Sequence, residues 1–233
     1  MKKYKHLFFD LDGTIWDFET NSIETLNDIY HKYSLKQYFD NFEVFVKTYH
    51  KHNDKLWAKY REGKIEKKVL NIQRFLLTTE EAGLTDYEIA KEIAHDYITI
   101  SPTKKKLFPY AHEILTALQK EYKLHIITNG FSEVQFLKLE NSNLTQYFTE
   151  IIISEKVGIM KPAPKIFEHS LNLAGAKKPE SIMIGDNLEV DILAAANFGI
   201  DQVYFNPGKK PHNENITFEI NSLIKLSSII KTF

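Results

Sequence analysis

Short apolar runs alternate with helical patterns over the second half of the chain. The runs that predict β-strands are residues 123–128, 150–154, 181–185 and 202–205, with a similar run near Leu7–Asp10. Helical spacing covers residues 133–144, 164–174 and 188–198. Nearly all-apolar strands separated by helices are typical of βαβ units, in which helices cover both faces of a parallel sheet. The pattern therefore predicts an α/β core with a parallel sheet.

The stretch between Trp16 and Ser101 has a different pattern. Ile23, Leu26 and Tyr30 fall on one helical face, and similar spacings recur at residues 42–49, 53–60, 69–77 and 87–98. We find no convincing strand in this stretch. We expect residues 16–105 to form an all-helical inserted domain, and residues 1–15 and 106–233 to form the α/β core.

Composition and charge narrow the class of protein. The 233 residues are 43% hydrophobic and 26% charged, as in an ordinary soluble globular protein. A net charge of -1 argues against nucleic-acid or membrane binding through bulk electrostatics. The absence of Cys excludes a disulfide framework, a thiol nucleophile and a Cys-ligated zinc site. Without a signal-peptide pattern or a membrane-spanning run, we expect a cytoplasmic protein.

Two carboxylates follow the first predicted strand. Asp10 and Asp12 are separated by one residue and lead into a loop that contains Gly13. At the point where a strand gives way to such a loop, both side chains can turn toward one crevice. A carboxylate pair of this kind can divide the roles of nucleophile and general acid/base.

Polar groups that suit a phosphate follow two further strands. Thr128 and Asn129 end the strand at 123–128 just before a helix, where a hydroxyl, an amide and free backbone N–H groups could cradle a phosphate. Lys161 lies between the strand ending near Ser154 and the helix from Pro164. A Lys at this position could reach a phosphoryl group and keep a carboxylate nucleophile ionised.

A second acidic cluster follows the strand at 181–185. Asp186 lies at the strand end, Asp191 falls in the first turns of the next helix, and Asn187 between them is a candidate N-cap. Mg²⁺ commonly binds one or two carboxylates together with water and phosphate oxygens. Asp10 and Asp186 are therefore the candidate direct ligands of Mg²⁺, and Asp191 is a candidate to orient a ligand or a bound water.

Taken in this order, the motifs resemble the haloacid dehalogenase superfamily. They are Asp10-x-Asp12-Gly13-Thr14, Thr128, Lys161 and Gly185-Asp186-x4-Asp191. The resemblance implies a Rossmann-like core with an inserted C1-type helical cap. It also implies that Asp10 forms an aspartyl-phosphate and that Asp12 acts as acid and base while its backbone carbonyl binds Mg²⁺. Thr128, Asn129 and Lys161 would then grip the phosphoryl group.

A narrower resemblance concerns the substrate. Segments 127–131, 153–162 and 56–65 are similar to the house-cleaning pyrimidine 5'-nucleotidases of this superfamily. That similarity implies that the substrate is a small phosphate ester, namely a pyrimidine nucleoside 5'-monophosphate.

Other functions on the same fold stay open. A sugar-phosphate phosphatase is the main alternative, and a sugar-phosphate mutase, a phosphonate hydrolase, a 2-haloacid dehalogenase and a catalytically silent scaffold protein are the others. Asp12 and Asp186 argue against a dehalogenase, which needs no Mg²⁺-supported acid, and the filled catalytic positions argue against a scaffold.

Trp16 and Phe18, which lie between Asp12 and the helical stretch, could line the pocket or pack in a hinge.

Overall fold

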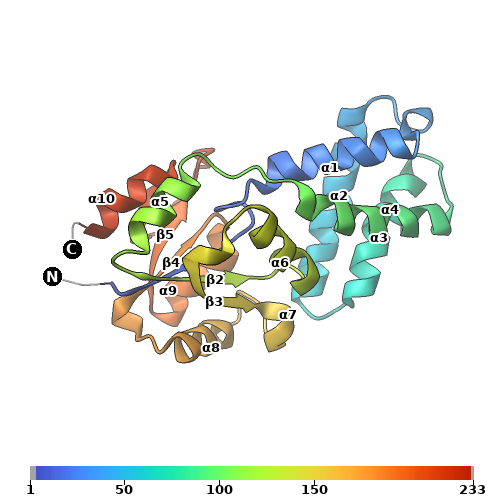
Figure 1. The fold of residues 1–233 in the computed structure, drawn as a ribbon. Helices are drawn as coiled ribbons and strands as arrows, with labels where there is room; N and C mark the ends of the chain where they lie inside the picture. Colours follow the sequence, from blue (N-terminus) through green and yellow to red (C-terminus); the bar gives the residue numbers. More distant parts are fainter. Residues whose placement is uncertain (1–3, 232–233) are drawn as a thin grey trace. The chain divides into compact units, whose positions relative to one another are not determined.

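The computed structural model describes residues 4–231, and the chain divides into two compact units (Figure 1). The core unit comprises Met1–Phe18 and Lys105–Phe233, and the helical unit comprises Glu19–Lys104. The chain thus leaves the core unit soon after its first strand and returns before its second.

The core unit contains a six-stranded parallel sheet. Its strands run in the order β3-β2-β1-β4-β5-β6, and every neighbouring pair is parallel. Their bounds are β1 (His6–Phe9), β2 (Lys123–Thr128), β3 (Phe148–Ile153), β4 (Ser181–Gly185), β5 (Asp201–Phe205) and β6 (Phe218–Ile220). The predicted parallel α/β sheet is confirmed, and β6 is an additional short strand that the apolar pattern did not predict.

Helices cover both faces of this sheet. Leu7 and Phe9 of β1 pack into one apolar cluster with α5, α6 and α10, whereas Phe8 packs into another with α8 and α9. This alternation follows from the two-residue period of a strand, so a central strand that is buried on both faces is apolar throughout. The core helices are α5 (Ala111–Leu118), α6 (Ser132–Asn141), α7 (Ser154–Val157), α8 (Pro164–Ala174), α9 (Ala194–Phe198) and α10 (Leu226–Lys231).

Single turns of 3-10 helix and one π-helical segment complete the core unit. The 3-10 turns are η3 (Thr145–Tyr147), η4 (Lys178–Glu180) and η6 (Leu223–Lys225), and the π-helical segment is η5 (Leu188–Leu193). The helix predicted at 188–198 is therefore present as η5 followed directly by α9.

Helix α6 does not bury all of its apolar side chains, as a simple amphipathic helix would. Val134 and Leu139 are buried, but Phe136 and Leu137 between them are exposed. The remaining buried positions of this helix are polar, namely Gln135 and Lys138. A buried polar pair on a helix that faces an α/β core requires partners, and those partners lie in the candidate site described below.

The helical unit contains four long helices, α1 (Phe18–Lys32), α2 (Phe42–Arg61), α3 (Lys67–Glu81) and α4 (Tyr87–Ile100). It also contains the 3-10 turns η1 (Leu35–Gln37) and η2 (Ser101–Thr103). Aromatic side chains of α1, α2, α3 and α4 share one apolar cluster. The two helical spacings at 42–49 and 53–60 belong to the single helix α2, whose N-terminus is capped by the Asn41 side chain.

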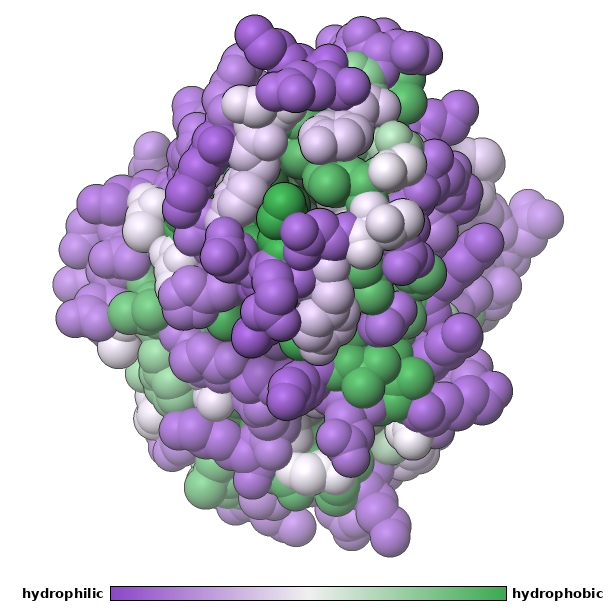
Figure 2. Space-filling view, turned by 90° about the vertical axis from the view of Figure 1, so that its right-hand side faces the viewer, coloured by the Kyte–Doolittle hydropathy of each residue, from purple (hydrophilic) through white to green (hydrophobic). Residues whose placement is uncertain are grey.

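The surface is largely polar. In the view of Figure 2, hydrophilic side chains cover most of the visible face, and apolar side chains form small separate groups. Among the described residues, no helix is both long and apolar enough to cross a bilayer.

Two imidazoles are buried between β1 and β2. The Nδ1 atom of His6 lies 3.0 Å from Nε2 of His125, and the two rings are stacked. His125 also stacks on Phe8, with the ring centroids 4.7 Å apart. Burial, together with the neighbouring His6 and Lys123, lowers the pKa of His125 to about 4. Burial likewise lowers the pKa of His6.

This pair predicts a loss of stability in mild acid. Unfolded His125 binds a proton below pH 6.5, whereas the folded imidazole resists protonation down to about pH 4. His125 therefore does not lower the stability of the fold above pH 6.5, and it lowers it progressively as the pH falls toward 4. We expect the free energy of unfolding to decrease by about 2 kcal/mol over this window because of His125 alone.

Urea denaturation at a series of pH values measures this effect. His125→Gln should flatten the decrease between pH 6.5 and 4. His169→Gln, which changes an exposed imidazole on α8, is the matched control and should keep the wild-type slope. An unchanged slope in His125→Gln would show that this imidazole does not set the acid sensitivity.

Candidate active site

Three strand ends meet at one edge of the sheet. In the parallel register, Phe9 of β1 lies opposite Ile126 of β2 and Ile184 of β4. The residues just after β1 and β4 and at the end of β2 therefore emerge side by side, which is where open α/β sheets bind ligands. The structure brings together the seven predicted site residues, Asp10, Asp12, Thr128, Asn129, Lys161, Asp186 and Asp191.

Lys161 is the buried cation of this site. Its Nζ atom lies 2.6 Å from Asp10 Oδ1 and 2.6 Å from Asp191 Oδ1, and it donates to the carbonyl of Ile127 at 2.7 Å. Burial alone would lower the pKa of Lys161, but the two carboxylates outweigh it and raise the pKa. The ammonium group therefore stays charged and holds the Asp10 carboxylate at the end of β1.

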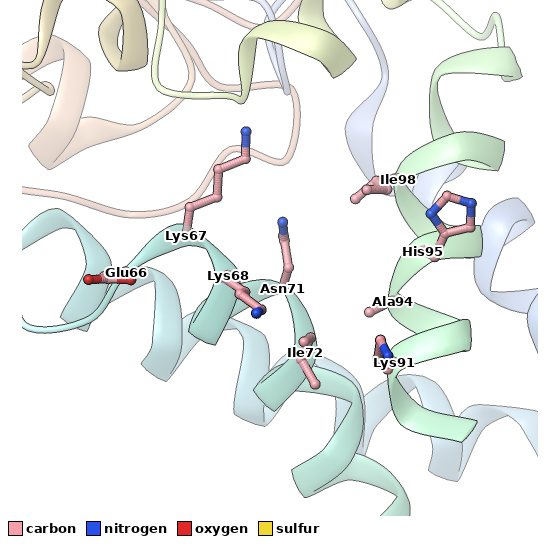
Figure 3. A pocket seen from close by; sticks show the side chains of 9 residues that line it. All are labelled: Glu66, Lys67, Lys68, Asn71, Ile72, Lys91, Ala94, His95 and Ile98. Atoms are coloured by element: carbon pink, nitrogen blue, oxygen red, sulfur yellow. The ribbon is translucent and has the colours of Figure 1, made fainter. Parts of the chain in front are cut away.

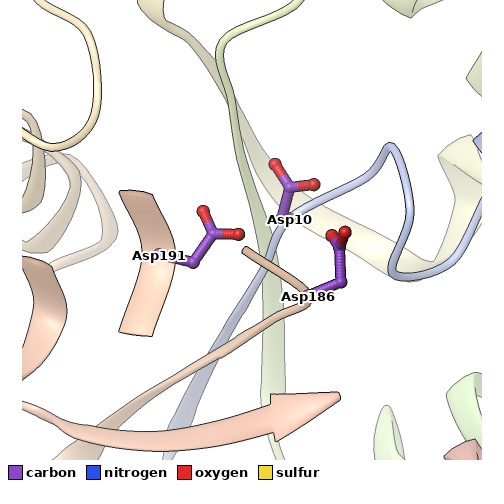
Figure 4. Close-up of side chains that lie close together, drawn as sticks. All are labelled: Asp10, Asp186 and Asp191. Carbon is purple, nitrogen blue, oxygen red and sulfur yellow. The ribbon is translucent and has the colours of Figure 1, made fainter. Parts of the chain in front are cut away.

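Three carboxylates crowd around this ammonium. One oxygen from each of Asp10, Asp186 and Asp191 lies within 4.8 Å of the other two. Figure 4 shows the three side chains close together. Burial raises the pKa of Asp10 well above its usual range, against the opposing effect of Lys161. Burial and the nearby Asp191 raise the pKa of Asp186 to about 7.

With its carboxyl groups ionised, the cluster has more negative than positive charge. One ammonium faces three carboxylates, and the oxygen atoms are hard donors. A divalent cation bound by oxygen would balance this charge, so the residues present fit Mg²⁺. Among the described residues, this is the one group of three acidic or His side chains with such spacing.

The loop after β1 is built to approach Asp186 closely. Thr14 Oγ1 donates to Asp186 Oδ1 at 2.9 Å. Gly13 has φ +87°, and a Cβ atom there would lie 2.4 Å from Asp186 Oδ2. Only glycine satisfies both the left-handed backbone and the lack of space, which explains the Gly in this motif.

Thr128 and Asn129 have different positions in the site. Thr128 Oγ1 accepts hydrogen bonds from Gly130 N at 3.1 Å and from Gln135 Nε2 at 2.7 Å, so its own proton is available for donation. The Asn129 side chain instead bonds both backbone groups of Lys161, accepting from N at 3.0 Å and donating to O at 2.8 Å. In this structure Asn129 thus fixes the backbone that carries Lys161.

The residues after β4 also have distinct roles. Asn187 Oδ1 accepts from the backbone N–H groups of Glu189 and Val190, which confirms it as an N-cap. Asp191 uses one oxygen for Lys161 and the other for the Asn187 N–H at 3.2 Å. Both of its oxygens are bonded within the protein, as is typical of a carboxylate that orients its neighbours.

Two site residues were not predicted from the sequence. Gln135 and Lys138, one turn apart on α6, both contact the Asp12 carboxylate. Their i, i+3 spacing is compatible with one helical face, but exposed polar pairs have the same spacing. The sequence signal that could have identified them is their position on α6 directly beside Val134 and Leu139, which are also buried.

Trp16 and Phe18 pack within the core unit. Trp16 is fully buried in the apolar cluster that contains Leu7 and Phe9, and Phe18 packs against that cluster. Trp16 also forms an antiparallel bridge with Leu107, where the chain returns to the core unit. Both aromatic residues therefore contribute to the apolar packing of the core unit.

Comparison with known proteins identifies the family. A model of haloacid dehalogenase-like hydrolases matches residues 4–199. The chain belongs to this family. It is 31% identical to pyrimidine 5'-nucleotidase YjjG of Escherichia coli (strain K12), with 98% of each chain covered. It is 30% identical to pyrimidine 5'-nucleotidase PynA of Streptococcus pneumoniae, with 92% of this chain and 87% of that protein covered.

A solved structure of this family has nearly the same fold. The magnesium-bound crystal structure of YfnB from Bacillus subtilis superposes with a TM-score of 0.89 at 27% identity, covering 99% of this chain and 100% of the other. The expected Rossmann-like core with an inserted helical domain is therefore confirmed, and the chain is a member of a hydrolase family.

Proposed function

We propose that this hydrolase cleaves phosphomonoesters through an aspartyl-phosphate formed on Asp10. The observation that carries the proposal is the clamp on Asp10 at the end of β1, where Lys161 binds Oδ1 at 2.6 Å. Among the described residues, no donor is hydrogen-bonded to Oδ2, which leaves this oxygen for attack on phosphorus. Asp12 lies on the same loop and supplies the acid/base that the reaction needs.

The reaction has two steps. An Asp10 oxygen bonds to phosphorus as the ester P–O bond breaks, and Asp12 gives a proton to the leaving oxygen. A water oxygen then attacks phosphorus while Asp12 takes the water proton, and the bond to Asp10 breaks to release phosphate. The Thr128 hydroxyl, whose proton is available, donates to a phosphoryl oxygen. Lys161 uses its three N–H groups for Asp10, Asp191 and the Ile127 carbonyl, and its positive charge beside Asp10 offsets the charge of the phosphoryl group.

Mg²⁺ would be held by Asp10, Asp186 and the backbone carbonyl of Asp12, with Asp191 as an orienting group. The surplus of carboxylates around Lys161 supports this assignment, as does the magnesium-bound structure of YfnB. When bound, the ion supplies positive charge that offsets the charge on the phosphoryl group.

We further propose that pyrimidine nucleoside 5'-monophosphates are the preferred substrates. The similarity to YjjG and PynA extends over nearly the whole chain and therefore includes the helical unit. Between α3 and α4 this unit contains a cavity of about 430 Å³ (Figure 3), whose lining combines donors such as Asn71 and His95 with apolar groups such as Ile72 and Ile98. Such a lining suits a base with a flat face and hydrogen-bonding edges.

The first prediction from the proposed function concerns the nucleophile. Asp10→Asn should fold but lose at least about 100-fold in kcat, equivalent to about 2.7 kcal/mol, because an amide is a poor nucleophile and a weak Mg²⁺ ligand. Steady-state assays with p-nitrophenyl phosphate measure the loss. Asp40→Asn, a change of an exposed carboxylate, should retain wild-type activity. Asp10→Asn activity near the wild-type level would rule out the aspartyl-phosphate.

The second prediction concerns the metal. Dialysis against EDTA should abolish activity, Mg²⁺ should restore it, and Ca²⁺ should inhibit because its larger and looser shell spoils in-line geometry. Asp186→Asn should raise the Mg²⁺ concentration needed for half-maximal activity at least about tenfold. Full turnover in excess EDTA would refute metal dependence.

The third prediction concerns the substrate. At equal Mg²⁺, kcat/KM for UMP or dTMP should exceed that for glucose 6-phosphate and AMP. The contacts that the base makes remote from phosphorus can lower the barrier only if they form in the transition state. A sugar phosphate preferred by about tenfold, or about 1.4 kcal/mol, would replace the nucleotidase with a sugar-phosphate phosphatase. Activity on no phosphomonoester at all would reject the phosphatase itself.

A further inference from the structure

Helix α6 holds the carboxylate of Asp12 by both oxygens. Lys138 Nζ donates to Asp12 Oδ1 at 2.6 Å, and Gln135 Nε2 donates to Oδ2 at 2.9 Å. Two donors on successive turns of one helix fix the plane of the carboxyl group as well as its position. Asp12 lies in a loop that is itself tied by hydrogen bonds from Gly13 N to Trp16 O and from Trp16 N to Leu11 O, at 2.9 Å each.

The Lys138 ammonium has little freedom of its own. Its side chain is only 4% exposed, and Nζ lies 4.1 Å from the centroid of the Trp16 ring and 5.7 Å from that of Phe18. A lysine is usually solvated and mobile, and its burial against aromatic faces has a cost in desolvation and in side-chain entropy. Apolar packing at such a position is often as stable as an ion pair, so stability by itself does not account for Lys138.

Gln135 connects Asp12 to the phosphate-binding side of the site. The same Nε2 that donates to Asp12 also lies 2.7 Å from Thr128 Oγ1. The loop after β2 leaves room for this amide, because a Cβ atom at Gly130 would lie 2.4 Å from Gln135 Nε2. The space that glycine leaves at this position is filled by the side chain that bonds Asp12.

We propose that Lys138, assisted by Gln135, is a positioning residue that aims the Asp12 carboxyl group at the leaving oxygen. The inference rests on the proposed phosphatase activity, in which Asp12 transfers the proton. Proton transfer demands hydrogen-bond distance and alignment, so a carboxyl group that is free to rotate would protonate the leaving group less effectively. In this role Lys138 acts through Asp12 and not through a contact with the phosphoryl group.

The dependence of kcat/KM on the leaving group of the substrate tests this role of Lys138. Nitrophenolate departs without needing a proton, whereas an alkoxide leaving from a nucleoside 5'-monophosphate or from glycerol 2-phosphate needs one. In Lys138→Met, kcat/KM should fall about 100-fold for the alkyl esters but only about threefold for p-nitrophenyl phosphate. Since kcat/KM reports the steps up to ester cleavage, this split isolates the step in which Asp12 gives its proton.

Three further variants complete the experiment. Lys120→Met removes an exposed ammonium from the core unit and should leave both classes of substrate unchanged. Lys138→Arg, which keeps a cationic donor that can stack on Trp16, should regain about tenfold over Lys138→Met on alkyl esters. Gln135→Leu should show the same split in weaker form, and it replaces Lys138→Met if circular dichroism shows that Lys138→Met does not fold.

The outcomes separate this inference from the proposed function. A wild-type enzyme that hydrolyses phosphomonoesters, combined with an equal loss on both classes in the variants, would make Lys138 merely structural and overturn the inference. Unchanged activity on alkyl esters in the folded variants would overturn it as well. A wild-type protein that hydrolyses neither class would instead reject the phosphatase on which the inference rests.

Discussion

The buried ion pairs of Lys161 are the interaction on which the site depends. Its ammonium lies between Asp10 and Asp191, and removing it would leave buried carboxylates with no compensating charge. The ammonium stays in place because the Ile127 carbonyl accepts from it and the Asn129 side chain binds the backbone that carries it. The neighbouring strand ends can therefore hold several carboxylates close together in a buried position.

This crowding also explains why the site suits a cation and a dianionic phosphate together. A divalent ion bound by Asp10 and Asp186 would offset the surplus charge, and a phosphoryl group would then find positive charge from the ion and from Lys161. The buried carboxylates favour binding of the ion at the expense of the stability of the metal-free protein. Function and stability are thus in tension at the edge of the sheet.

The site has two layers of positioning. Residues at the strand ends hold the proposed nucleophile Asp10, whereas helix α6 holds the proposed acid/base Asp12 from the side through Gln135 and Lys138. The two are joined at Thr128, whose hydroxyl accepts from Gln135. A carboxylate that must give and take protons needs a fixed direction, and a rigid helix provides this better than a loop does.

The sequence by itself determined five of the six strands in the described sheet, the long helices and the edge of the sheet that carries the chemistry. Short, nearly continuous apolar runs predicted β2 and β4. Polar residues in the segments that follow strands predicted Asp10, Lys161 and Asp186 as neighbours. Only the tertiary structure decided which face of α6 is turned inward. Gln135 and Lys138 look like solvated positions along the chain, and their burial depends on Trp16 and Asp12, which are distant in sequence. A local sequence pattern shows whether a segment has the period of a helix or of a strand. Which residue a buried polar group contacts depends instead on how distant segments pack together.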